Sequence, residues 1–96
     1  MAEIDLAGKV VIEFYGQGCL NCQMMTPIIN NLEKDFPDVR FYRVNADDHH
    51  ALVQQYQVAS LPTLLLFRHG QILGRIVGVK AQQTLHNLID QTLNYA

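Results

Sequence analysis

A chain of 96 residues, 49% of them hydrophobic and 17% charged, suits one folded domain spanning residues 1–96 and excludes a disordered protein. The formal net charge of −2, with seven scattered Lys and Arg residues, argues against nucleic-acid binding. The longest apolar run, Leu64–Phe67, is too short to cross a membrane, and the acidic Glu3 and Asp5 do not suit a secretory signal. We therefore expect a cytoplasmic protein that does not enter membranes.

The predicted elements begin with a strand followed by a helix. Lys9–Tyr15 is a short apolar run, rich in β-branched and aromatic residues, that is typical of a strand covered on both faces. The helix expected over Gln23–Phe36 has a single apolar stripe formed by Met25, Ile28, Ile29 and Leu32. Pro27 is expected to kink or interrupt this helix, because proline removes one backbone donor.

The remaining elements lead to a fold class. They are a strand over Val39–Val44, a short helix through Ala51 and Tyr56 capped by Asp47 or Asp48, a hairpin of Thr63–Arg68 and Ile72–Val77 turning at His69–Gln71, and a helix over Ala81–Asn94. A strand–helix–strand unit requires a parallel pair, and the hairpin adds an antiparallel strand. The order β-α-β-α-β-β-α therefore predicts an α/β fold, with a mixed four-stranded sheet and helices on both faces.

The two cysteines of the chain, Cys19 and Cys22, stand at the predicted strand-to-helix turn. The free N–H groups and the positive dipole end of a helix favour thiolate over thiol there, and thiolate is the species that attacks disulfides. A dithiol in a cytoplasmic protein is more often catalytic or metal-binding than a structural crosslink.

Two alternatives to a reactive dithiol stay open at this point. The cysteines would be inert if they were both buried in an apolar setting. They would also offer half of a metal site, with His49 and His50 as further ligands, but adjacent histidines on a helix point about 100° apart and do not naturally share a metal. We therefore expect no metal, and expect His49, His50, His69 and His86 to be solvated.

The chain resembles the thioredoxin family from about Gly8 to its C-terminus. The matching motifs stand in register and are Val11–Tyr15 leading into Gly18-Cys19, Pro27 five residues beyond Cys22, Asn45-Ala-Asp47, Ser60-Leu-Pro-Thr63, Gly70 and Val77-Gly78. The resemblance implies a thioredoxin-like fold and thiol–disulfide exchange. Cys19 would be the nucleophile and Cys22 the resolving thiol, since Cys22 is close enough to release a mixed disulfide formed on Cys19.

Glu13 is the odd residue of the first predicted strand. A carboxylate in this apolar run is either exposed or buried with a raised pKa. In most of the family an aspartate at the matching position relays a proton to the resolving cysteine, so the resemblance implies that role for Glu13, which is one methylene longer.

Pro62 and Gly78 each have a structural and a functional interpretation. Pro62 would simply begin a strand, or, as the resemblance implies, follow a cis Leu61–Pro62 peptide that leaves the backbone of Leu61 free to pair with substrate. Gly78 is either a turn residue or a position that leaves room for the substrate chain.

Several positions depart from the usual family pattern. Gly18 replaces the usual tryptophan, Leu20-Asn21 replaces Gly-Pro, and Gln23 replaces a frequent lysine. The substrate-binding surface would comprise Gly18, Leu20, Leu61 and Gly78. Because Gly18 and Leu20 differ from the usual family residues, this surface would have its own partner preference.

The N-terminus differs from the family as well. About eight residues precede Lys9, too few for the strand and helix that members usually carry there. The strand Val39–Asn45 would then be a free edge able to pair with another chain, unless Glu3–Leu6 covers it. We expect a monomer or a weak edge-strand dimer.

The sequence as a whole predicts a protein-disulfide reductase that cycles Cys19 and Cys22 between dithiol and disulfide. Its partners would be disulfide-containing proteins and an external reductase or thiol donor, and the cycle needs no bound cofactor. The alternatives are a binding module with little turnover and a peroxide-reactive thiol sensor.

Overall fold

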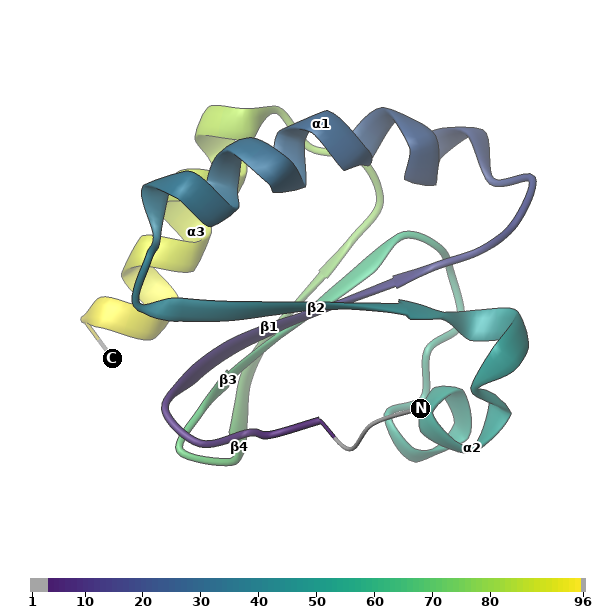
Figure 1. Ribbon diagram of the computed structural model, residues 1–96, viewed down its shortest axis with the longest axis horizontal. Helices are drawn as coiled ribbons and strands as arrows, with labels where there is room; N and C mark the ends of the chain where they lie inside the picture. Colours follow the sequence, from purple (N-terminus) through teal and green to yellow (C-terminus); the bar gives the residue numbers. More distant parts are fainter. Residues whose placement is uncertain (1–3, 96) are drawn as a thin grey trace.

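A computed structural model describes residues 4–95 and contains a four-stranded sheet covered by helices (Figure 1). The strands are β1 (Lys9–Tyr15), β2 (Val39–Asn45), β3 (Thr63–Arg68) and β4 (Gln71–Val77). Their order in the sheet is β2-β1-β3-β4, with β1 parallel to β2 and antiparallel to β3, and β4 antiparallel to β3. The mixed four-stranded sheet predicted from the sequence is confirmed.

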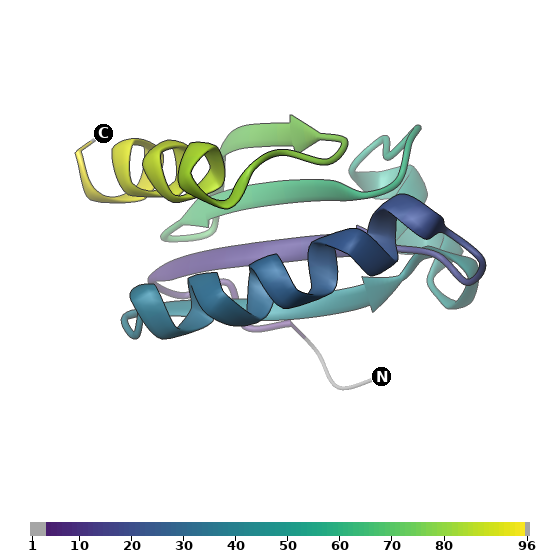
Figure 2. The ribbon, with the colours of Figure 1, turned by 90° about the horizontal axis from the view of Figure 1, so that it is seen from above.

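Helices lie on both faces of this sheet, as predicted. The long helices α1 (Leu20–Asp35) and α3 (Gln82–Asn94) share one face, while the 3₁₀ turn η1 (Ala46–Asp48) and the short helix α2 (His50–Gln55) lie on the other (Figure 1). Seen from above, α1 runs over β1 and β2, and α3 runs beside β3 and β4 (Figure 2). No helix in residues 4–95 is long and apolar enough to span a membrane.

The central strand β1 divides the core into two clusters. Its Val11 packs with the buried faces of α1 and α3, whereas Val10, Ile12 and Phe14 belong to the cluster on the α2 side. Because strand side chains alternate between faces, Glu13 shares the face of Val11 and lies under the long helices. The sheet therefore places this carboxylate beneath the helix that begins at the dithiol.

Helix α1 begins earlier than predicted and is not interrupted. Its first residue is Leu20, so Cys22 lies in its first turn and Cys19 is its N-cap. Pro27 lies inside the helix, which continues to Asp35. Proline removes one backbone hydrogen bond, and the buried stripe of Cys22, Met25, Ile29 and Leu32 holds the helix on the sheet.

The prediction that Asp47 or Asp48 caps a helix is wrong. Asn45 caps η1 instead, its Oδ1 accepting from the Asp47 N–H at 2.9 Å. Helix α2 starts later, at His50, without a side-chain cap. Both aspartates are exposed, so their carboxylates are available for other contacts.

The β3–β4 hairpin turn is one residue shorter than predicted. His69 and Gly70 alone form the loop, with φ of +52° and +81°, and Gln71 already belongs to β4. Two successive residues of positive φ are typical of the tight turn that suits the twist of paired strands.

The N-terminal segment lies against the sheet but does not extend it. Ile4 and Leu6 pack on the α2-side cluster, and the Leu6 carbonyl accepts from the Gly70 N–H at 3.0 Å. Within residues 4–95, β2 is therefore an edge strand with β1 as its one partner. Glu3, the first residue of the segment expected to cover this edge, lies outside the described residues.

Candidate active site

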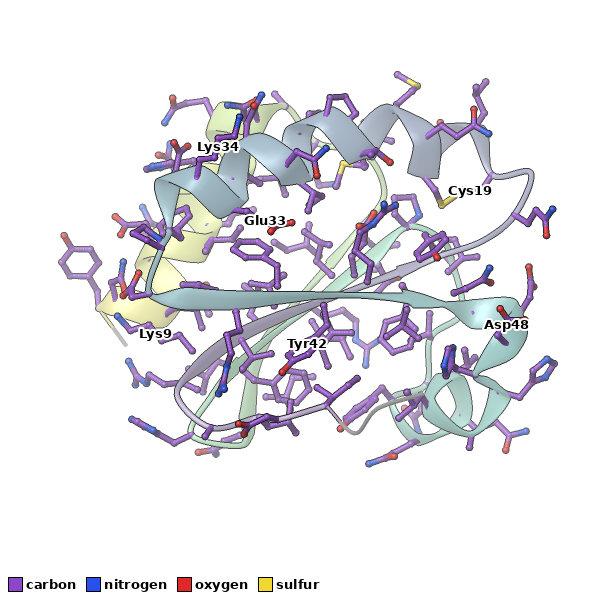
Figure 3. The ribbon with its side chains drawn as sticks, viewed as in Figure 1. Lys9, Cys19, Glu33, Lys34, Tyr42 and Asp48 are labelled. Atoms are coloured by element: carbon purple, nitrogen blue, oxygen red, sulfur yellow. A yellow bond between two sulfur atoms is a disulfide. The ribbon has the colours of Figure 1, made fainter. Side chains whose placement is uncertain are left out.

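Cys19 and Cys22 form a disulfide with their Cα atoms 5.2 Å apart. Figure 3 shows Cys19 at the N-terminal end of α1. As the N-cap residue, Cys19 presents its Sγ to the Cys22 N–H, which donates to it at 3.1 Å. Cys19 is half-buried whereas Cys22 is 3% exposed. An incoming disulfide can therefore reach the outer sulfur, and the inner one is shielded.

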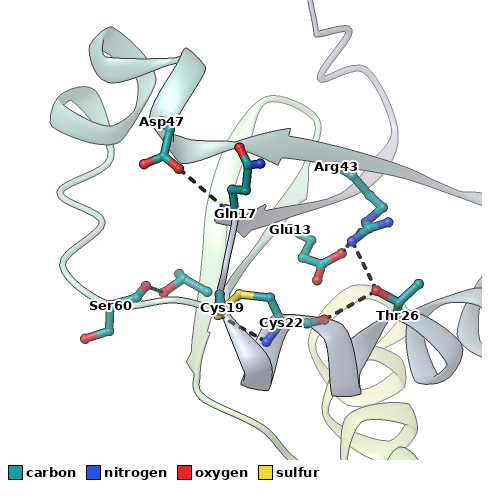
Figure 4. The surroundings of a disulfide bond; sticks show 9 residues. Glu13, Gln17, Cys19, Cys22, Thr26, Arg43, Asp47 and Ser60 are labelled. Carbon is teal, nitrogen blue, oxygen red and sulfur yellow. Dashed lines mark hydrogen bonds and ion pairs between the residues drawn. A yellow bond between two sulfur atoms is a disulfide. The ribbon is translucent and has the colours of Figure 1, made fainter.

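Glu13 lies beneath the disulfide and is 1% exposed. Burial raises the pKa of its carboxyl group, and the nearby Arg43 guanidinium opposes that shift. Arg43 Nε donates to Glu13 Oε1 at 2.8 Å, while Oε2 has no hydrogen-bond partner among the described residues. Figure 4 shows the carboxyl group pointing toward α1, with one oxygen on Arg43. One carboxyl oxygen is thus held by Arg43, and the other is buried without a hydrogen bond in residues 4–95.

Arg43 connects Glu13 to the helix that carries the dithiol. It stands opposite Glu13 in the parallel register of β1 and β2, and its guanidinium lies 4.6 Å from the centre of the Tyr15 ring. The same group donates to Thr26 Oγ1 at 3.3 Å, and the Thr26 hydroxyl donates to the Cys22 carbonyl at 3.3 Å (Figure 4). A continuous polar chain thus runs from Glu13 to the backbone of Cys22.

The loop before β3 faces the start of α1. The Leu61–Pro62 peptide is cis, and the Pro62 carbonyl accepts from the Gly78 N–H at 2.9 Å. Neither backbone group of Leu61 has a backbone partner in the part of the chain that the structure describes. The structure therefore brings Leu61, Pro62 and Gly78 together at one end of the sheet.

Gly16 explains how this loop approaches the dithiol. A Cβ added to Gly16 would lie 2.7 Å from Leu61 Cδ1, so the Leu61 side chain packs directly on this glycine. The contact sets the Leu61–Pro62 loop against the Gly16–Cys19 loop, and the two form one surface.

The other predicted substrate contacts are open to solvent. Gly18 and Gly78 have φ of +73° and +88°, and an added Cβ would meet nothing within 4 Å at Gly18 and only Lys80 Nζ, at 4.0 Å, at Gly78. Leu20 is 69% exposed beside Cys19. On either side of Cys19 in the chain, Gly18 thus exposes its backbone and Leu20 projects an apolar side chain.

The histidines form contacts of their own, away from the sulfurs. His49 Nδ1 lies 2.9 Å from the Asn45 carbonyl, and His50 Nε2 lies 2.8 Å from that of Asp47. Among residues 4–95, no three His, Cys, Asp or Glu side chains are arranged to hold a metal ion.

The expectation that all four histidines are solvated holds for His50 and His69 and is wrong for the other two. His49 is half-buried, and so is His86, which packs against Phe36 with ring centres 4.8 Å apart and the ring planes tilted by 40°. His86 follows the buried Leu85 on α3, and its imidazole packs at the C-terminal end of α1, where Phe36 lies.

Sequence reasoning missed Arg43, Thr26 and Gly16. The opposite charges of Glu13 and Arg43 were a usable signal, because both strands were predicted and a parallel pairing was expected. Whether Glu13 and Arg43 face each other depends on the register of the two strands, which their sequences did not determine. Nothing in the sequence pointed to Thr26 or Gly16.

A mixed sheet with a disulfide at the N-terminus of its first helix, facing a cis-proline loop, defines a thiol–disulfide oxidoreductase. Comparison with known proteins agrees: the family model described as Thioredoxin matches residues 2–91. The chain belongs to the thioredoxin family.

Individual relatives cover most of the chain. A thioredoxin of Chlamydia caviae is 43% identical over 84 residues, which are 88% of this chain and 82% of the relative. The oxidised mitochondrial thioredoxin 3 of Saccharomyces cerevisiae is 33% identical, with a TM-score of 0.83 over 88% of this chain and 79% of that one. A mutant thioredoxin of Halobacterium salinarum is 29% identical, with a TM-score of 0.86 over 94% of this chain and 79% of that one. The predicted family, fold and activity, protein-disulfide reduction, are confirmed.

Proposed function

We propose that Cys19 is the attacking thiolate and Cys22 the resolving thiol of the protein-disulfide reductase cycle. Cys19 Sγ⁻ attacks one sulfur of a substrate disulfide, forms a mixed disulfide, and releases the other substrate sulfur as a thiolate. Cys22 then loses its proton and attacks Cys19 Sγ, which expels the second substrate thiolate. The products are a reduced substrate and the Cys19–Cys22 disulfide, and an external thiol donor or reductase restores the dithiol.

The observation that carries this assignment is the unequal setting of the two sulfurs. Cys19 is accessible and its Sγ accepts a backbone N–H at the helix N-terminus, an arrangement that stabilises a thiolate. Cys22 is buried and has no route to a protein substrate except through Cys19.

Glu13 takes the proton that Cys22 must lose. Its carboxyl group is buried under α1 with Oε2 unpartnered, and its raised pKa brings it closer to the pH at which a general base works best. Replacing Glu13 with Gln should slow resolution of the mixed disulfide by about 100-fold or more and leave the first attack by Cys19 nearly unchanged.

The substrate binds as an extended segment along Leu61 and Pro62. The free N–H and C=O groups of Leu61 pair with its backbone, a form of strand addition. Gly18 and Gly78 leave room for the chain, and the exposed Leu20 adds apolar contact. The partners are disulfide-containing proteins and a reductase or thiol donor, and a reducing cytoplasm is the compartment that suits this direction of exchange.

The proposal is tested by measuring the rate at which the protein reduces a model protein disulfide, with dithiothreitol as the thiol donor. We expect the wild type to accelerate reduction, and Cys19→Ser to lose the acceleration. A wild type whose dithiol oxidises normally but accelerates nothing would favour a binding module. Consumption of peroxide much faster than of protein disulfides would favour a thiol sensor.

A further inference from the structure

An open pocket of about 340 Å³ lies on the α2 side of the dithiol, between the η1–α2 segment and the loop that leads to Pro62. Its walls include the aliphatic side chains of Val53, Val58 and Leu61, and its rim carries Asp47 and His50. The thiol chemistry does not use this pocket, and the strand-addition step shares only Leu61 with it.

The pocket adjoins the proposed path of the substrate. Leu61 belongs to both, because it lines the pocket and offers its backbone to the substrate. Asp47, which also lines the pocket, accepts at Oδ2 from the backbone N–H of Gln17 at 3.5 Å, two residues before Cys19 (Figure 4). Asp48, the neighbour of Asp47, stands at the same end of the molecule as Cys19 (Figure 3).

The chemistry of the lining favours a cationic side chain. Asp47 supplies an exposed carboxylate, and no Lys or Arg is among the described residues that line the pocket. The Lys or Arg stem is aliphatic and its head is cationic, so the stem matches the valine and leucine walls and the head matches the carboxylate. An acidic side chain would meet repulsion from Asp47, and an apolar one would remove water from its carboxylate without replacing it.

We propose that this pocket selects disulfide substrates that carry a Lys or Arg close to the attacked cysteine. The inference rests on the proposed function and adds a substrate class to it. A substrate strand rises about 3.3 Å per residue, so a side chain one or two residues from that cysteine lies within about 7 Å of it along the chain. We expect one of the four flanking positions to place its side chain at the Asp47 pocket, since Leu61 lies both on the substrate path and in the pocket lining.

A lysine scan of a disulfide peptide tests this inference. The reference peptide carries norleucine at the two positions on each side of the attacked cysteine, and four further peptides carry one Lys each. Their kcat/KM values are measured with the wild type, Asp47→Asn and Asp48→Asn. The two variants remove the same charge from adjacent exposed positions, but only Asp47 lines the pocket.

We expect Lys at one position to raise kcat/KM about fivefold over norleucine with the wild type, mainly through KM. This preference should vanish in Asp47→Asn, persist in Asp48→Asn, and weaken as salt is added. The quantity compared is the ratio of kcat/KM for the Lys peptide to that for the norleucine peptide within each protein, so a change in turnover of the norleucine peptide by a variant does not enter the comparison.

Two results would overturn the pocket assignment while the reductase assignment stands. One is the absence of any preferred Lys position, and the other is an equal loss of preference in both variants, which would indicate a general field effect. If the wild type failed to reduce even the norleucine peptide, the proposed function would fall first, and this inference with it.

Discussion

The Arg43 guanidinium holds one oxygen of the buried Glu13 carboxyl group, with Nε and Oε1 2.8 Å apart across the parallel strands β1 and β2. The Arg43 side chain is 36% exposed and that of Glu13 is 1% exposed, so the pair spans the boundary between solvent and core. Burial raises the pKa of Glu13 and Arg43 opposes the rise. Glu13 thus occupies a site in which it can change protonation state without leaving the core.

Glu13 should make the stability of the oxidised protein fall as pH rises. The pKa of Glu13 in the folded state is above its ordinary value of 4.5, so between these two values the folded chain binds more protons than the unfolded chain. The loss of stability caused by ionising the buried Glu13 carboxyl group is absent below pH 4.5, grows through this window, and is complete above the folded pKa. Glu13→Gln should flatten that slope in urea unfolding measured over a pH series.

Glu33→Gln is the matched control for this experiment. Glu33 is exposed on α1 and contributes a small repulsion that raises the pKa of Glu13, so its removal should leave most of the slope in place. An unchanged slope in Glu13→Gln would show that other groups cause the pH dependence.

Removing Arg43 should raise the pKa of Glu13 further. The guanidinium stabilises the carboxylate by charge and by a hydrogen bond, and Arg43→Met removes both. Titration of the Glu13 carboxyl carbon by NMR should therefore move to higher pH. Arg40→Met removes the same charge from the same strand but breaks a contact with Asp5 instead, so it should barely move the titration. Equal shifts in the two variants would contradict a direct pair.

Gly16→Ala should weaken substrate binding through Leu61. The new methyl group would lie 2.7 Å from Leu61 Cδ1, so the leucine side chain must shift. We expect KM to rise severalfold with a smaller change in kcat, and stability to fall by about 1 kcal/mol. In a Leu61→Ala background the methyl group finds space, and Gly16→Ala should then have little further effect on KM. Additive effects on KM in the double variant would contradict this coupling.

A strained glutamine follows helix α2, two residues beyond its last residue. Gln57 has a φ of +53°, and its N–H bonds the Gln54 carbonyl while the Val58 N–H bonds that of Val53. This pattern is the C-terminal motif in which glycine is preferred, because other residues resist the left-handed conformation. Gln57→Gly should raise the free energy of unfolding by about 0.5–1 kcal/mol.

The control for that substitution is Gln55→Gly, at the last residue of the same helix. There, glycine adds backbone freedom without relieving strain, and stability should fall by about 1 kcal/mol. Chemical denaturation of both variants checks the opposite signs, and a loss of stability in both would show that Gln57 is not strained.

The fold was predictable because its patterns are local. The apolar run of β1, the stripe of α1 and the turn at His69-Gly70 each identify an element, and their order dictates the sheet. The predicted helix starts were wrong where neighbouring side chains compete to cap the same backbone N–H groups. Asn45 rather than Asp47 caps η1, and the first turn of α1 begins at Leu20 because Cys19 itself acts as the cap.

The site was predictable only where a motif lies within a short segment. Cys19 and Cys22 stand together in the sequence. The cis conformation of the Leu61–Pro62 peptide was predicted from the family resemblance alone. The contact of Glu13 with Arg43 depends on strand register, and that of Gly16 with Leu61 depends on two loops meeting. Asp47 or Asp48 was expected as a helix cap, whereas Asn45 caps η1 and Asp47 lines a pocket.

The most direct test of the account is to trap the mixed disulfide. Reduced Cys22→Ser is mixed with a protein disulfide, and the covalent adduct is digested and mapped by mass spectrometry. We predict a stable adduct on Cys19, and no adduct when reduced Cys19→Ser is treated in the same way. An adduct on Cys22 in the Cys19→Ser protein, formed as fast as the one on Cys19, would contradict the division of roles between the two sulfurs.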